Sequence, residues 1–110
     1  PLYSSAASDV YKRQVIKIVE ENICEADFSV KKLAAEMNMS QPTLYRKVKQ
    51  STDYTIIELI RGVRMRRAGV LLKTKQYAVQ EVAEMVGYND IPTFRKHFVD
   101  AFGTTPSTYE

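Results

Sequence analysis

The sequence predicts an all-α fold in which a long connecting helix joins two helix-turn-helix subdomains. No segment shows sustained alternation of apolar and polar residues, which is the pattern of a half-buried strand. Residues 33–48 (LAAEMNMSQPTLYRKV) and residues 82–98 (VAEMVGYNDIPTFRKHF) repeat one pattern, with one added residue in the second turn. The matched positions are Ala34 and Ala83, Pro42 and Pro92, Thr43 and Thr93, Leu44 and Phe94, Arg46 and Lys96, and Val48 and Phe98.

The composition is that of one folded domain. The 110 residues are 45% hydrophobic and 26% charged, and the net charge of +3 permits an anionic partner without demanding one. No apolar run approaches the roughly twenty residues of a membrane span, so no membrane contact is expected. The single cysteine, Cys24, excludes a disulfide within the chain and favours the reducing cytoplasm. We expect Cys24 to be a buried apolar residue on the first helix.

The first residues differ in origin from the rest of the chain, by our interpretation. Residues 4–14, SSAASDVYKRQ, resemble the translation of a common transposase-based sequencing adapter. We therefore expect residues 1–14 to be a non-native leader and residues 15–110 to form the domain. The same hypothesis implies that an N-terminal domain is missing upstream.

The first helix-turn-helix is predicted over about residues 29–50, after a helix over residues 15–23. Ser29 and Ser40 are good N-caps because a serine hydroxyl accepts a hydrogen bond from a free amide at a helix start. Asn38 tolerates the left-handed backbone that such a turn often needs. The apolar residues at helical spacing are Val15, Ile16, Val19, Ile23, Val30, Leu33, Ala34, Met37, Leu44 and Val48.

The connecting helix is predicted over about residues 56–72. At about 1.5 Å per residue it spans roughly 26 Å, and the added width of a small helical unit reaches the spacing of about 34 Å between successive major grooves. One of Arg64, Arg66 and Arg67 is expected to be a structural ion-pair partner. The predicted apolar face is Ile56, Ile57, Leu59, Ile60, Val63, Leu71 and Leu72.

The second helix-turn-helix is predicted over about residues 79–101. Ala78 stands where a capping side chain is expected, whereas Asp90 caps the next helix. Gly87 and Gly103 end their helices, and Thr105 and Pro106 start one more short helix. The apolar positions are Val79, Val82, Ala83, Val86, Phe94, Phe98, Phe102 and Tyr109.

Outward side chains on the second helix of each repeat suit DNA. That helix enters the major groove in helix-turn-helix proteins, where arginine, lysine and glutamine read base edges. Neither helix has an outward carboxylate after its cap until Asp100. We therefore predict binding of double-stranded DNA through Gln41, Pro42, Thr43, Tyr45, Arg46, Lys49, Ile91, Pro92, Thr93, Arg95 and Lys96.

The chain from about residue 23 to residue 109 resembles the DNA-binding domain of the bacterial AraC/XylS family of transcription regulators. The matching stretches are SVKKLAAEMNMSQPTLYRKVK, ELIRGVRMRRAGVLL and VQEVAEMVGYNDIPTFRKHFVDAFGTTPSTY. The resemblance implies about seven helices, recognition helices at about residues 40–50 and 90–101, and an upstream sensing, receiver or oligomerising domain. Base contacts carry over to Pro42, Thr43, Tyr45, Arg46, Ile91, Pro92, Arg95 and Lys96. The departures are Ala78 and the two prolines, which stand where many members have polar or aromatic readers.

Two other classes of function remain open at this point. One is a helical protein-interaction module that contacts the transcription machinery, and RNA polymerase is an expected partner in either case. The other is an enzyme, such as a DNA-repair fusion with Cys24 as acceptor, and burial of Cys24 would count against it. The sequence has no catalytic triad, paired-carboxylate cleft, zinc spacing or phosphate-binding glycine loop, so no cofactor, metal or catalysis is expected.

Overall fold

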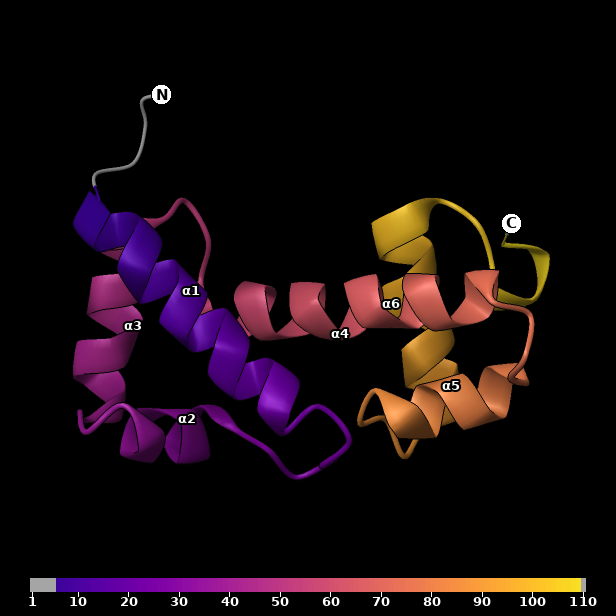
Figure 1. The fold of residues 1–110 in the computed structure, drawn as a ribbon, viewed down its shortest axis with the longest axis horizontal. Helices are drawn as coiled ribbons and strands as arrows, with labels where there is room; N and C mark the ends of the chain where they lie inside the picture. The colour runs from indigo at the N-terminus through magenta and orange to yellow at the C-terminus, as the bar shows by residue number, and fades with distance from the viewer. Residues whose placement is uncertain (1–5, 110) are drawn as a thin grey trace. The chain divides into compact units, whose positions relative to one another are not determined.

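The computed structural model describes residues 6–109 of the chain, with side chains from residue 12 onward. The described residues form helices and no strand, which confirms the predicted all-α class (Figure 1). The helices are α1 (Ala6–Glu21), α2 (Val30–Glu36), α3 (Gln41–Ser51), α4 (Ile56–Lys73), α5 (Val79–Met85), α6 (Ile91–Phe102) and the 3₁₀ helix η1 (Pro106–Thr108). The last of the seven expected helices is therefore a single 3₁₀ turn.

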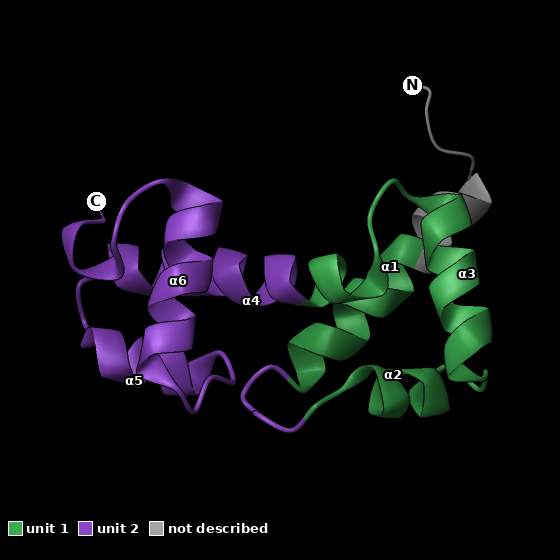
Figure 2. Ribbon diagram, turned by 180° about the vertical axis from the view of Figure 1, so that it is seen from behind, with its two compact units in different colours: residues 1–22, 28–60 green, residues 23–27, 61–110 purple. Residues whose placement is uncertain are grey.

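The chain divides into two compact units, shown in Figure 2. Among the described residues, unit 1 consists of residues 6–22 and 28–60, and unit 2 consists of residues 23–27 and 61–109. Each unit contains one complete copy of the repeat, α2 with α3 or α5 with α6. Helix α4 contributes its first five residues to unit 1 and the remainder to unit 2.

Unit 1 is built from α1 packed on both helices of the first repeat. The Ser29 hydroxyl accepts from the Lys32 amide at 3.5 Å and so caps α2 as predicted. Asn38 adopts the left-handed conformation, with φ of 57°, in the turn between α2 and α3. The buried apolar residues are Val15, Ile18, Val19, Phe28, Leu33, Ala34, Met37, Leu44, Val48, Ile56 and Leu59.

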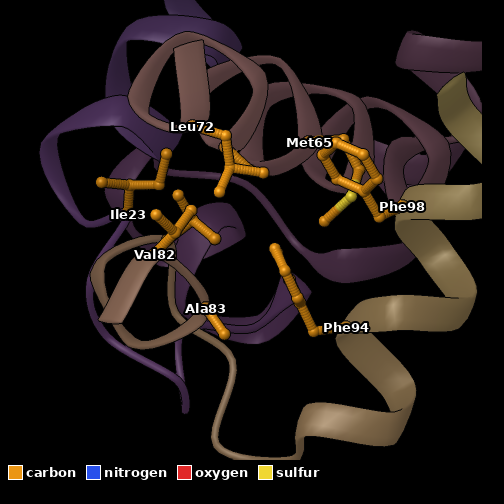
Figure 3. Packing of buried hydrophobic residues seen from close by; sticks show 9 residues of the cluster. Ile23, Met65, Leu72, Val82, Ala83, Phe94 and Phe98 are labelled. Atoms are coloured by element: carbon orange, nitrogen blue, oxygen red, sulfur yellow. The ribbon is translucent and has the colours of Figure 1, made fainter. Parts of the chain in front are cut away.

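Unit 2 is organised around an apolar cluster that α6 anchors (Figure 3). Its fully buried rings, Phe94 and Phe98, lie along one face of α6, and the ring of Tyr109 contacts Phe98 edge-on at 5.2 Å between centroids. The cluster consists of Ile23, Met65, Ala68, Leu72, Val82, Ala83, Val86, Phe94 and Phe98.

One predicted helix end and two predictions about burial are wrong. The first helix ends at Glu21 and not at Ile23, so Ile23 packs into unit 2 from the segment after α1. Cys24 lies in that same turn and is exposed, not buried on a helix. On α4, Ile57 is 50% exposed, whereas Met65 and Ala68, absent from the predicted face, are almost fully buried.

The apolar face of α4 was predicted incorrectly because this helix contributes buried residues to the cores of both units. Ile56 and Leu59 are buried in unit 1, while Met65, Ala68 and Leu72 are buried in unit 2. A helix packed in one core buries a single stripe of period 3.6, but this helix changes its neighbours after Ile60. A single stripe therefore cannot be read through its whole length.

Candidate nucleic-acid interface

Helix α3 begins with a cap that also engages its first threonine. The Ser40 hydroxyl accepts from the Thr43 amide at 3.3 Å and donates to Thr43 Oγ1 at 2.8 Å. Pro42 lies in the first turn, where its missing N–H leaves no helix hydrogen bond unmade. Leu44 and Val48 are buried against unit 1. This burial turns the opposite face of α3 toward solvent.

The predicted DNA-binding residues of α3 lie on that face. Thr43 is half-buried, and its hydroxyl oxygen accepts a hydrogen bond from Ser40. The Lys49 ammonium lies 3.5 Å from the Asp53 carbonyl oxygen. The exposed members of the set are Gln41, Pro42, Tyr45, Arg46 and Lys49.

Helix α6 repeats this arrangement with a stronger cap. Asp90 Oδ2 accepts from the Thr93 amide at 3.3 Å and also from the Thr93 hydroxyl. The carboxylate is favoured there by the partial positive charge of the helix N-terminus. Pro92 again lies in the first turn. Both prolines thus have a structural reason to stand at the start of a recognition helix.

The predicted DNA-binding residues of α6 divide into two groups. Ile91 and Thr93 are half-buried, and Ile91 packs against the apolar cluster of unit 2, so it also contributes to the core. Pro92, Arg95 and Lys96 are exposed. In each unit the structure therefore gathers an exposed proline and exposed cations on the second helix of the repeat.

Arg64 supports the turn that leads into α6, a role that the sequence did not reveal. Its Nη1 donates to the carbonyl oxygens of Val86 at 2.9 Å and Gly87 at 2.7 Å, and its Nη2 donates to that of Glu25 at 3.2 Å. Burial lowers the pKa of the guanidinium, and nearby Tyr88 opposes that shift. One of three arginines of α4 was expected to form a structural ion pair. Among the described residues, Arg64 has the structural role, but its hydrogen-bond partners are backbone carbonyls and not a carboxylate.

The same turn requires a glycine and holds a second polar contact. Gly87 has φ of 89°, and a Cβ there would lie 1.8 Å from Arg64 Nη1 and 2.4 Å from the Ile23 carbonyl oxygen. Tyr88, the next residue, lies with its hydroxyl 2.6 Å from His97 Nδ1 on α6. Burial, followed by Arg61, lowers the pKa of His97, with Asp100 opposing and Lys96 adding to the shift. His97 is thus a partly buried histidine that packs against Tyr88.

Helix α5 compensates for its missing cap. Ala78 has no side-chain oxygen, but Glu81 Oε1 accepts from the Ala78 amide at 2.9 Å. One free donor at the helix start is therefore satisfied from inside the helix.

Comparison with known proteins decides the identity of the fold. A family profile described as "Helix-turn-helix domain" matches residues 33–110. The DNA-binding domain of AdpA, solved in complex with a target DNA, is 31% identical with a TM-score of 0.80, covering 89% of this chain and 87% of that chain. The chain belongs to the AraC/XylS family of helix-turn-helix DNA-binding domains. The domain itself is a sequence-specific DNA-binding domain of the kind found in transcription regulators.

Other relatives of this AraC/XylS domain are longer proteins. The chain is 32% identical over 106 residues to "Histidine kinase P4" of Formosa agariphila, matching 96% of this chain and 8% of that protein. It is 32% identical to the "Msm operon regulatory protein" of Streptococcus mutans, matching 96% of this chain and 38% of that protein. The chain thus spans well under half the length of these relatives.

The family assignment, and not the burial of Cys24 that was expected to decide it, bears on the function classes left open by the sequence. The family match favours DNA binding over an enzyme that uses Cys24, whereas the expected burial of Cys24 is wrong, since Cys24 is exposed. Across the described residues, no helix is both long enough and apolar enough to cross a bilayer.

Proposed function

We propose that this AraC/XylS domain reads two adjacent major-groove segments of one DNA duplex, one with the first half of α3 and one with the first half of α6. Exposed side chains at the start of such helices reach base edges, while those further along meet phosphates. Tyr45, Arg46, Arg95 and Lys96 are the exposed polar readers, and Lys49 is the phosphate contact.

One observation carries the proposal. Arg46 and Lys96 are both exposed, and each is the sixth residue of its helix. Each helix also has a proline in its first turn and an N-cap side chain that hydrogen-bonds to a threonine. A solvated cation needs no such match. Two equivalent cations on two equivalently capped helices favour two equivalent contacts with DNA.

Alanine substitution tests these residues. Arg46→Ala and Lys96→Ala should each weaken binding to a site selected from a randomised duplex library by about 1–3 kcal/mol and relax the base preference at one position. Lys17→Ala removes the same charge from the exposed face of α1 and is the matched control. Fluorescence anisotropy at fixed salt measures the affinities, and wild-type affinity in both α3 and α6 variants would refute the assignments.

We also propose that the full-length protein carries an upstream sensing or receiver domain and contacts RNA polymerase. The lengths of the two relatives outside the matched part support a further domain. Determining the reading frame upstream of Val15 by an independent library method tests both this proposal and the adapter hypothesis. An in-frame start codon close to Val15, with no further domain, would contradict the first.

A further inference from the structure

A shallow groove in unit 2 is apolar in its floor and basic at its sides. It lies between α4, the C-terminal end of α6 and Tyr109, and has a volume of about 390 Å³. The apolar lining comes chiefly from Met65, Val70, Phe102 and Tyr109. A hollow of this size accommodates one or two large side chains of a partner.

The floor of the groove is made by close approach of aromatic rings to the α4 backbone. A Cβ added at Gly69 would lie 3.0 Å from Phe102 Cζ and 3.4 Å from the Tyr109 hydroxyl oxygen. Beside this floor, Val70 is 58% exposed. The glycine therefore leaves the aromatic rings and an exposed valine as one continuous apolar surface.

Cations flank this apolar surface. Arg66, Val70 and Lys73 follow one another at i, i+4 and i+7, so they form one stripe along α4. Both cations are exposed, and Lys73 Nζ lies 5.5 Å from the centroid of the Tyr109 ring. Among the described lining residues there is no carboxylate. The complement of this surface is an apolar side chain flanked by carboxylates.

We propose that this groove binds an acidic amphipathic segment of a partner protein. Large apolar side chains of the segment enter the hollow, and its carboxylates pair with Arg66 and Lys73. Phe102 is the last residue of α6, roughly 9 Å along the axis from Lys96 at about 1.5 Å per residue. The groove and the half of α6 proposed to read DNA are therefore at different ends of one helix.

An NMR titration tests the groove with a defined probe. The probe is a short helix-forming peptide with leucine and phenylalanine at i, i+4 and i+7 and glutamate between them. We expect shifts in the backbone amides of Gly69, Val70 and Tyr109. Val70→Glu should weaken binding about tenfold or more, which corresponds to the loss of one buried apolar contact. Val99→Glu is the matched control, because Val99 is an exposed valine of unit 2 outside the groove.

Charge is tested separately from apolar contact. Replacing the peptide glutamates by glutamines, or Arg66 by alanine, should weaken binding several-fold at low salt, while Val70→Glu retains affinity for the selected DNA site. Failure of the peptide to shift groove amides, or equal loss with Val99→Glu, would overturn the proposal. Equal binding of the uncharged peptide would also overturn it. If Arg66→Ala weakens DNA binding and the peptide does not bind, the cations beside the groove contact DNA phosphates and the proposal is wrong.

Discussion

At the residue scale, Arg64 shows how a buried charge organises a recognition element. Its side chain is 6% exposed, and three carbonyl oxygens occupy its fork of donors. Two of these carbonyls, those of Val86 and Gly87, follow directly after the end of α5. A buried charge is costly unless it is hydrogen-bonded. Arg64 therefore stabilises the turn before α6 only because all these acceptors are in place.

Replacing Arg64 should destabilise unit 2. Arg64→Met leaves the carbonyls of Val86, Gly87 and Glu25 without this donor, and we expect a loss of about 2–4 kcal/mol in the free energy of unfolding. Arg67→Met is the control, since Arg67 is exposed on the same helix and should change stability by less than about 0.5 kcal/mol. Urea denaturation measures both, and equal effects would contradict the structural role of Arg64.

His97 should make stability depend on pH in the acid range. Because its folded-state pKa lies below the ordinary 6.5, the unfolded chain takes up the proton first as pH falls. The His97 contribution is therefore fully present above about pH 6.5 and decreases below it. Chemical denaturation at several pH values should show a loss that His97→Gln removes. An unchanged pH profile in His97→Gln would show that other groups cause it.

At the element scale, helix starts and helix glycines decide local stability. Ser40 and Asp90 satisfy amides at the starts of α3 and α6, and each positions the threonine three residues later. The two glycines of α4 look alike in sequence, yet they differ in surroundings. A Cβ at Gly62 would meet nothing within 4 Å, whereas a Cβ at Gly69 would lie 3.0 Å from the Phe102 ring.

Alanine at these two glycines should have different effects. Gly62→Ala should raise the free energy of unfolding by up to about 1 kcal/mol, because alanine is the better helix former. Gly69→Ala gains the same propensity but must displace the Phe102 ring, so we expect no net gain or a loss. Thermal unfolding of the two variants side by side measures the difference. Equal stabilisation would show that the ring moves freely.

At the scale of the whole molecule, two units each carry a complete helix-turn-helix. The repeat seen in sequence is matched in three dimensions, since the paired positions Ala34 and Ala83 are both buried, as are Leu44 and Phe94. If both units read DNA as proposed, one chain contacts two groove segments without a dimer.

Two reading elements predict two contacts on DNA. Methylation interference on the selected site should show two patches of guanines whose methylation blocks binding, about 10 base pairs apart, as two helix-turn-helix elements on one face of the duplex require. The affinity should also fall steeply with salt, because phosphate contacts release counterions. A single patch, or two patches that appear only at concentrations where the chain dimerises, would contradict reading by a monomer.

Local features were predicted well because they depend on few neighbouring residues. The caps Ser29, Ser40 and Asp90, the left-handed Asn38 and the turn glycine Gly87 all follow from backbone rules that a short stretch expresses. Most outward positions of α3 and α6 were predicted for the same reason, since two buried apolar residues per helix determine the exposed face, but Thr43, Ile91 and Thr93 are half-buried.

The sequence by itself therefore determined the helices, the repeat and the exposed cations of each recognition helix. Only the tertiary structure decided that Arg64 binds backbone carbonyls, that Cys24 is exposed and that the Phe102 ring packs against the backbone at Gly69. These outcomes depend on segments distant in the chain, such as Glu25 for Arg64 and Phe102 for Gly69. Spacing along a chain reveals which face of a helix is apolar, but which neighbour covers it is settled only when distant segments pack.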